Sequence, residues 1–136
     1  MTRKSVLFLC TGNSARSQIA EGLLRSMAGD RYEVHSAGTH PKGLHPQTVI
    51  TMREIGIDVS QHTSKSTDMF QGKPFDFVVT VCDRAKESCP FFPGARSLHW
   101  SFEDPADATA GEQLALFRRV RDQIRRRLEE FVTTED

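Results

Sequence analysis

The stretch that decides the fold is Val6-Leu7-Phe8-Leu9-Cys10-Thr11-Gly12-Asn13-Ser14-Ala15-Arg16-Ser17. The apolar residues 6–9 predict a buried strand, and the periodic apolar residues of 17–28 predict a helix directly after the loop. A strand, a short polar loop and a helix in this order point the loop amides at one spot, where the partial positive charge of the helix N-terminus favours an anion. The stretch therefore predicts an α/β fold with an anion-binding loop at the end of its first strand.

Cys10 and Arg16 give this loop its expected chemistry. The planar guanidinium of Arg16 can close the ring of donors around an anion. A cysteine at a helix N-terminus beside a cation is often a thiolate near neutral pH, and the Ser17 hydroxyl can donate to it. A lone cysteine at a strand end is more often a small buried hydrophobe, but these spacings favour a nucleophile that attacks a tetrahedral oxyanion. The candidate substrate-binding residues are Thr11, Gly12, Asn13, Ser14, Ala15, Arg16 and Ser17.

The composition limits the class of protein. With 136 residues the chain is predicted to form a single domain, 1–136. Lys+Arg and Asp+Glu each number 18, and this zero formal charge argues against a nucleic-acid partner, which needs a basic surface. No apolar run approaches the ~20 residues that span a bilayer, and no signal peptide is visible. We therefore expect a cytoplasmic protein without a membrane partner.

The order of the predicted elements indicates the topology. Strands alternate with helices, which is typical of βαβ units with a parallel sheet. Ligands of such sheets bind at the carboxyl ends of the strands, and Cys10 and Cys82 each follow a predicted strand, so neighbouring strands would bring both thiols to one edge. The predicted strands are 4–9, 32–37, 75–81 and 98–102, the predicted helices are 17–28, 45–55 and 111–131, and a turn with one short helix is expected within 60–69.

Cys82 and Cys89 form a second candidate site. Three cysteines in a reducing compartment favour catalytic or redox use over structural disulfides. The residues between Cys82 and Cys89 are helix-compatible, and a helix would separate the two Cα atoms by about 10 Å. A disulfide needs about 4.4–6.8 Å, so a bridge requires this segment to rearrange. The alternative is two unrelated buried thiols. The histidines and cysteines lack metal-site spacing, so no metal is predicted.

Asp104 is the candidate general acid. An oxyanion that loses an oxygen needs a proton, and a carboxylic acid on a loop above the pocket is the usual source. Asp104 precedes Pro105, which restricts its backbone to extended conformations. Glu103 is the rival candidate from the same loop.

Three of these features together resemble the low-molecular-weight protein tyrosine phosphatase fold: the 10–17 loop, the turn at 36–39 (Ser-Ala-Gly-Thr) and Asp104-Pro105. With Cys82 and Cys89, the whole chain is similar to the thioredoxin-coupled arsenate reductases of that fold. The resemblance implies a three-layer α/β architecture with a four-stranded parallel sheet flanked by helices. It also implies a monomer without a bound cofactor, an arsenate or phosphate oxyanion as ligand, and thioredoxin as electron donor.

The resemblance further implies a three-cysteine relay for arsenic detoxification. Cys10 attacks arsenate held by the loop, while Asp104 protonates the departing oxygen. Cys82 attacks next, which releases arsenite and leaves a Cys10–Cys82 disulfide. Cys89 then attacks Cys82, and a rearranged 82–97 segment presents the Cys82–Cys89 disulfide to thioredoxin. Each step is the attack of a thiolate on electrophilic arsenic or sulfur.

Two positions depart from the resemblance. Ala15 stands where many relatives carry a cysteine that can pair with the nucleophile, which favours the reductase over the phosphatase. The other departure concerns a potassium site of some relatives, three of whose groups match Asn13, Glu21 and Ser36. Its acidic fourth position is Lys65, whose ammonium either takes the place of the ion or is plain surface charge.

Two other functions are open at this point. A phosphotyrosine phosphatase would use the same loop, and weak phosphatase side activity is expected of a reductase too. Phosphotyrosine pockets need aromatic walls, for which only Trp100 and Phe102 are candidates. The other alternative is a non-catalytic oxyanion sensor or phosphocarrier, which has no use for Cys89.

Overall fold

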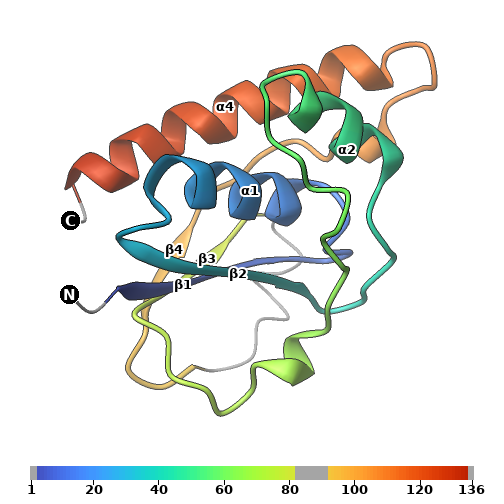
Figure 1. Cartoon of the computed structure of the whole chain (residues 1–136). Coiled ribbons are helices and arrows are strands. Elements are labelled where there is room, and N and C mark those ends of the chain that lie inside the picture. Colours follow the sequence, from blue (N-terminus) through green and yellow to red (C-terminus); the bar gives the residue numbers. More distant parts are fainter. Residues whose placement is uncertain (1–2, 82–91, 135–136) are drawn as a thin grey trace.

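A computed structural model describes residues 3–81 and 92–134 of the chain (Figure 1). Cys82 and Cys89 lie outside the described residues. The strands are β1 (Lys4–Cys10), β2 (Tyr32–Gly38), β3 (Phe77–Thr80) and β4 (Arg96–His99), the α-helices are α1 (Arg16–Ala28), α2 (Pro46–Arg53) and α4 (Gln113–Thr134), and the 3-10 helices are η1 (Thr67–Met69) and η2 (Pro105–Asp107).

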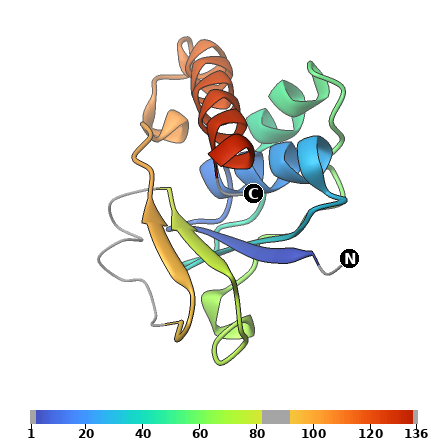
Figure 2. The same cartoon turned by 90° about the vertical axis from the view of Figure 1, so that its left-hand side faces the viewer.

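The four strands form one parallel sheet in the order β2-β1-β3-β4, which confirms the predicted sheet. β1 lies between β2 and β3, and its last residue, Cys10, pairs with Gly38 of β2. Helices α1, α2 and α4 cover one face of the sheet, and η1 lies beyond the other face (Figure 1, Figure 2). The carboxyl end of β1 therefore opens at the edge where α1 begins.

The central position of β1 follows from its sequence. Residues 6–9 are fully buried, and a continuous apolar run of this kind is typical of a parallel strand covered on both faces. Phe8 packs against Trp100 with ring centroids 6.1 Å apart, and Trp100 packs against Phe131 of α4 at 5.7 Å. Aromatic pairs of this kind contribute about 0.5–1.5 kcal/mol each beyond their buried area. β1, and with it the loop that follows, is thus held to the long helix.

The predicted bounds of β4, 98–102, are wrong at both ends. β4 begins at Arg96 and Ser97, which are exposed, so an apolar pattern could not reveal them. Trp100 still donates its backbone N–H to Thr80, but its side chain turns into the aromatic core, and β4 ends at His99. The predicted short helix within 60–69 is present as η1.

Helix α4 also fixes the position of α2. Arg121 of α4 is only 8% exposed, and it donates to the Thr51 carbonyl and to Glu54 Oε1, both at 2.8 Å. Arg118 donates to both oxygens of Glu54. These contacts hold α2, and therefore the segment that leads into it, beside the loop. None of the helices in the described ranges combines the length and the apolar character needed to cross a lipid bilayer.

Candidate active site

The loop between β1 and α1 forms the floor of a cavity of about 630 Å³. The cavity is lined by residues 10–12 and 14–16 of this loop, by residues 42–46 before α2, and by residues 104, 106 and 107 around η2. It lies at the carboxyl edge of the sheet, where ligands of parallel sheets bind. Three segments distant in sequence therefore meet around the predicted nucleophile.

Cys10 lies at the floor of the cavity and is 3% exposed. The backbone N–H of Asn13 donates to Cys10 Sγ at 3.2 Å, and Ser17 Oγ lies 2.7 Å from the same sulfur. Ser17 Oγ also accepts a hydrogen bond from Asn13 Nδ2 at 2.8 Å, and its own hydrogen is free to donate to the sulfur. Hydrogen bonds to the sulfur favour the thiolate, which is the nucleophilic form.

The side chain of Asn13 stabilises the loop through hydrogen bonds made outside the cavity. Its φ of +46° lies in the left-handed region, which asparagine adopts more readily than most residues. Its Nδ2 donates to the hydroxyls of Ser17 and Ser36, while its Oδ1 accepts from Gln18 Nε2 and from the Lys65 amide. Asn13 and Ser17 are fully buried and do not line the cavity. Their side chains position the loop, and an anion could meet only their backbone amides.

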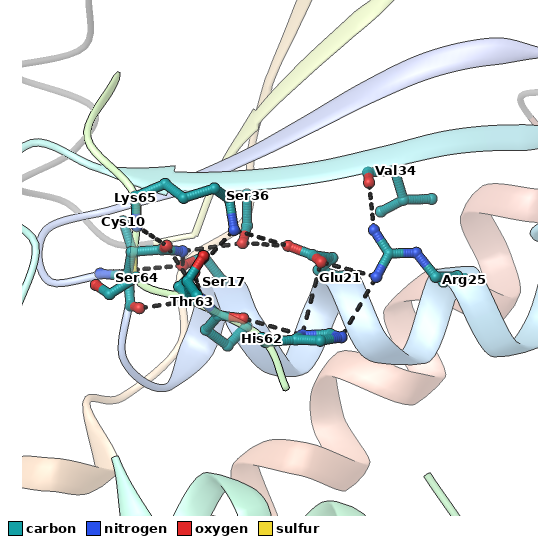
Figure 3. A network of polar contacts seen from close by, with 12 residues as sticks. Cys10, Ser17, Glu21, Arg25, Val34, Ser36, His62, Thr63, Ser64 and Lys65 are labelled. Carbon is teal, nitrogen blue, oxygen red and sulfur yellow. Dashed lines mark hydrogen bonds and ion pairs between the residues drawn. The ribbon is translucent and has the colours of Figure 1, made fainter. Parts of the chain in front are cut away.

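A buried carboxylate sets the direction of this network (Figure 3). Glu21 of α1 accepts a hydrogen bond from the Ser36 hydroxyl, because a carboxylate can only accept. Ser36 must then accept from Asn13 Nδ2, and the second hydrogen of that amide goes to Ser17. The hydrogens are assigned in this way from Glu21 to Ser17 Oγ. If Cys10 is a thiolate it can only accept, and the Ser17 hydroxyl then donates to its sulfur.

The surroundings of Glu21 decide whether a cation fits beside it. Arg25 Nη1 lies 2.9 Å from Glu21 Oε2, and Lys65 Nζ lies 3.8 Å from Oε1. Lys65 is therefore not plain surface charge: it faces the buried carboxylate and also donates to the Thr63 carbonyl. Because Glu21 already faces two cationic side chains, the arrangement does not fit a bound cation as well. Within the described ranges, no group of three or more His, Cys, Asp or Glu residues is arranged to hold a metal ion.

Arg16 and Asp104 line the cavity and contact each other. Arg16 is the first residue of α1, and its Nη2 lies 3.4 Å from Asp104 Oδ2. Arg16 Nη1 also donates to the Phe102 carbonyl at 3.0 Å. Asp104 caps η2 by accepting the Ala106 N–H at 3.0 Å, so its carboxylate is held in place over the loop. Asp104, the predicted acid, and Arg16, the arginine predicted to bind the anion, thus lie on the same side of the cavity.

The side chain of Glu103 does not reach the cavity. Its carboxylate lies 3.3 Å from Arg119 of α4, both side chains are exposed, and Glu103 does not line the cavity. Of the two rival carboxylates, Asp104 is the one that reaches the site.

The wall formed by residues 42–46 was not predicted from the sequence. Backbone N–H groups of Lys42 and His45 donate to the carbonyls of Gly12 and Ser14, which fastens this segment to the loop. Burial lowers the pKa of the His45 imidazole, and the charge of Asp104 opposes that effect. The only local signal was Pro46, which marks a helix start and places His45 at the N-cap position.

In the part of the chain that the structure describes, the cavity lining includes the imidazole of His45 but no Phe, Tyr or Trp. Trp100 is buried against Phe8 and Phe131, and Phe102 contributes its carbonyl to Arg16. The two candidates for an aromatic wall are thus not used as one.

Gly38 lets β2 approach the loop more closely than any other residue type would. A Cβ atom at this position would lie 2.6 Å from the Thr11 carbonyl oxygen and 2.8 Å from the Asn13 nitrogen. Both are backbone atoms and cannot move aside without moving the loop. The turn at 36–39 therefore belongs to the site as a support for its floor.

The comparisons with known proteins agree with this geometry. Residues 5–135 match the family described as Low molecular weight phosphotyrosine protein phosphatase. The chain is 46% identical to the arsenate reductase of Halalkalibacterium halodurans and 47% identical to that of Bacillus subtilis, each over 137 residues that cover 98% of this chain and 99% of the relative. It is also similar to a solved structure of an arsenate reductase in the phosphate binding state, with a TM-score of 0.80, 32% identity and coverage of 96% of this chain and 97% of that one. A further solved structure is a thioredoxin-dependent arsenate reductase of Corynebacterium glutamicum, with a TM-score of 0.72, 29% identity and coverage of 97% of this chain and 63% of that one.

Proposed function

The chain belongs to the low molecular weight phosphotyrosine protein phosphatase family, and from that premise we propose that it reduces arsenate to arsenite with electrons from thioredoxin. The observation that carries this proposal is a cavity with Cys10, Arg16 and Asp104 around it and no Phe, Tyr or Trp in its described lining. A cavity with this lining suits a small inorganic oxyanion better than an aryl phosphate, whose ring would need aromatic side chains to pack against. The names of the full-length relatives at 46% and 47% identity point to the same substrate.

The first step we propose is the attack of Cys10 on arsenic. The loop amides and Arg16 hold arsenate, and the Cys10 thiolate forms a sulfur–arsenic(V) bond. One oxygen of arsenate leaves as water after it takes a proton from Asp104. The two donors on Cys10 Sγ and the pairing of Arg16 with Asp104 support these roles, because they bring nucleophile, anion clamp and acid to one cavity.

The reduction itself is assigned to the second thiol. Cys82 attacks the sulfur of Cys10, the electron pair of the sulfur–arsenic bond passes to arsenic, and arsenite leaves while a Cys10–Cys82 disulfide forms. Cys89 then attacks Cys82 and frees Cys10, and thioredoxin reduces the resulting Cys82–Cys89 disulfide. This relay is supported by the three cysteines of the sequence and by a structurally similar reductase that depends on thioredoxin. A cytoplasmic monomer without a bound cofactor fits this chemistry, because the cytoplasm keeps thioredoxin reduced.

The test is arsenate-dependent oxidation of NADPH in the presence of thioredoxin and thioredoxin reductase. We expect sustained turnover for the wild type, and about one arsenite per enzyme followed by a stall for Cys89→Ala. Multiple turnovers in Cys89→Ala would rule out the relay. Absence of arsenate-dependent turnover, together with fast hydrolysis of an aryl phosphate, would replace the reductase with the second candidate.

That second candidate is a phosphotyrosine phosphatase, which the description of the family itself favours. The same thiolate and loop would attack phosphorus instead of arsenic. We expect only slow hydrolysis of p-nitrophenyl phosphate by this protein, as a side activity of the anion-binding loop.

A further inference from the structure

His45 belongs to the cavity wall but not to the loop that carries Cys10. It is the N-cap of α2, and its Nδ1 accepts the backbone N–H of Gln47 at 3.1 Å. Because Nδ1 is an acceptor, the proton of the neutral imidazole must be on Nε2. In the described part of the chain no hydrogen bond is found for Nε2, so its N–H is the donor that His45 can offer to a ligand.

The ring of His45 is held in one plane. It packs on Phe117 of α4, with ring centroids 4.8 Å apart and an angle of 36° between the planes. The backbone of His45 is fastened as well, because its N–H donates to the Ser14 carbonyl of the loop. His45 is therefore a rigid wall residue, fixed by α2, by α4 and by the loop itself.

Two opposing effects act on the pKa of the His45 imidazole. Burial disfavours the imidazolium, while the carboxylate of Asp104 favours it, and burial is the larger effect. Phe117, its neighbour on α4, is uncharged. The other charged or titratable residues that line the same cavity are Cys10, Arg16, Lys42 and Asp107.

We propose that His45 is an anion-binding residue of this cavity, which donates its Nε2–H to a tetrahedral oxyanion held by the loop and takes up one proton from solvent when that anion binds at mildly acidic pH. The inference rests on the proposed function, because it takes the cavity as an oxyanion site. No bond to the anion is made or broken. Because Nε2 already carries a hydrogen, the proton goes from solvent to Nδ1, which then no longer accepts the Gln47 N–H. A bound dianion favours the imidazolium, and a charge-assisted hydrogen bond is stronger than a neutral one.

The sign of the expected pH effect follows from this coupling. The imidazole pKa is higher in the complex than in the unbound protein, so the contribution of the imidazolium charge to affinity is full below the pKa of the unbound state. It is lost as the pH rises through the pKa of the complex. The anion itself and Cys10 also titrate, so the effect must be measured against a variant that keeps both.

The probe is inorganic phosphate. NMR of the imidazole nitrogens gives the pKa of His45 with and without phosphate, and we expect phosphate to raise it by about one unit, which corresponds to about a tenfold change in affinity. Phosphate affinity is then measured from pH 5 to pH 8 for the wild type and for His45→Asn. Asparagine keeps the N-cap acceptor and an N–H donor but does not titrate. We expect the affinity ratio of wild type to His45→Asn to be larger at pH 5 than at pH 8.

The matched control is His40→Asn, which removes an exposed imidazole from the preceding loop, outside the cavity lining. Its affinity ratio to wild type should not change with pH. A His45 pKa that phosphate leaves unmoved, or a ratio for His45→Asn that is flat with pH, overturns the role of His45 while the oxyanion site stands. If phosphate does not bind the wild type at all, the oxyanion site and the proposed function fail together with it. Should His45→Asn not fold, the NMR titration of the wild type decides alone.

Discussion

Arg16 Nη2 lies 3.4 Å from Asp104 Oδ2, so the arginine expected to bind the anion and the candidate acid form an ion pair in the lining of the cavity. An oxyanion that accepts from Arg16 competes with Asp104 for the same guanidinium. Binding of an oxyanion and the ion pair of the candidate acid are therefore coupled through one arginine.

Asp104→Asn tests this coupling. The variant keeps the shape of the side chain but cannot give a proton, so we expect kcat for arsenate reduction to fall about 10²-fold or more. Phosphate affinity should not fall, because Arg16 loses a competing carboxylate. The measurements are steady-state arsenate reduction and phosphate titration. Glu103→Gln is the matched control, since that carboxylate pairs with Arg119 outside the cavity, and an equal loss of activity there would contradict the assignment.

Ser17→Ala should make Cys10 harder to ionise. The hydroxyl that is directed at Cys10 Sγ is lost, and hydrogen bonds to charged groups contribute about 1.5–3 kcal/mol, or roughly one to two pKa units. The pH dependence of iodoacetamide alkylation gives this pKa when Cys82 and Cys89 are both replaced by serine. Ser64→Ala is the control, because that hydroxyl donates to the Gly12 carbonyl and not to the sulfur. Equal profiles for the Ser17→Ala variant and its parent would disprove the hydrogen-bond role.

Gly38→Ala should destabilise the protein and weaken phosphate binding together. The added methyl group meets backbone atoms of Thr11 and Asn13, and overpacking of this kind costs about 1–3 kcal/mol. Urea unfolding and phosphate titration measure the two effects. Gly111→Ala, whose Cβ would meet nothing within 4 Å, should change neither. A Gly38→Ala protein with unchanged phosphate affinity would mean that β2 does not support the loop.

Potassium should not stabilise this protein more than sodium does. Glu21 already faces Arg25 and Lys65, so no site for a further cation is expected beside it. Thermal unfolding in potassium chloride and in sodium chloride at equal ionic strength should give the same midpoint. A higher midpoint in potassium alone would show that Lys65 does not take the place of the ion.

Stability should fall as the pH drops below about 6.5, in part because of His62. Burial lowers its pKa, and Glu21 opposes that effect. Arg25 Nη1 lies 3.3 Å from His62 Nε2, where only a neutral ring can accept. The unfolded chain thus binds the proton more readily, so the stability contribution of His62 is full above pH 6.5 and is lost as the pH falls through its folded-state pKa.

His62→Gln should reduce this pH dependence, by roughly 1 kcal/mol for each unit of the pKa difference. The free energy of urea unfolding between pH 5 and pH 7.5 measures it. His40→Gln, at an exposed position, should leave the wild-type slope in place. A slope that His62→Gln does not change would assign the pH effect to other groups.

The loop and the parallel sheet could be predicted because each rests on local signals, whereas the neighbouring positions of β1 and β3 come from the structure. Residues 6–9 form one apolar run, and Cys10 and Arg16 stand close together in sequence. Asp104 could be proposed but not separated from Glu103, because the choice depends on Arg119, which lies on another helix. The exposed start of β4 carried no apolar signal at all.

Two parts of the site could not be predicted: the cavity wall formed by residues 42–46, and the hydrogen bonds that hold Asn13 in place. His45 reaches the cavity because α2 packs on α4 through Arg121 and Glu54, and no pattern in the sequence joins these residues. Gln18 and Lys65 contact Asn13 from two different segments. Contacts of this kind exist only once the chain has folded, since they depend on how elements distant in sequence pack.

The burial of β1 has a consequence for how the protein would be inactivated. The residues of a central strand open only with the whole domain, whereas edges and loops fray at low cost. Because Cys10 ends a strand whose residues 6–9 are fully buried, its placement is tied to the global unfolding transition. On heating, the geometry around the sulfur should persist until the domain as a whole is lost, with no earlier stage in which a folded protein has already lost its nucleophile.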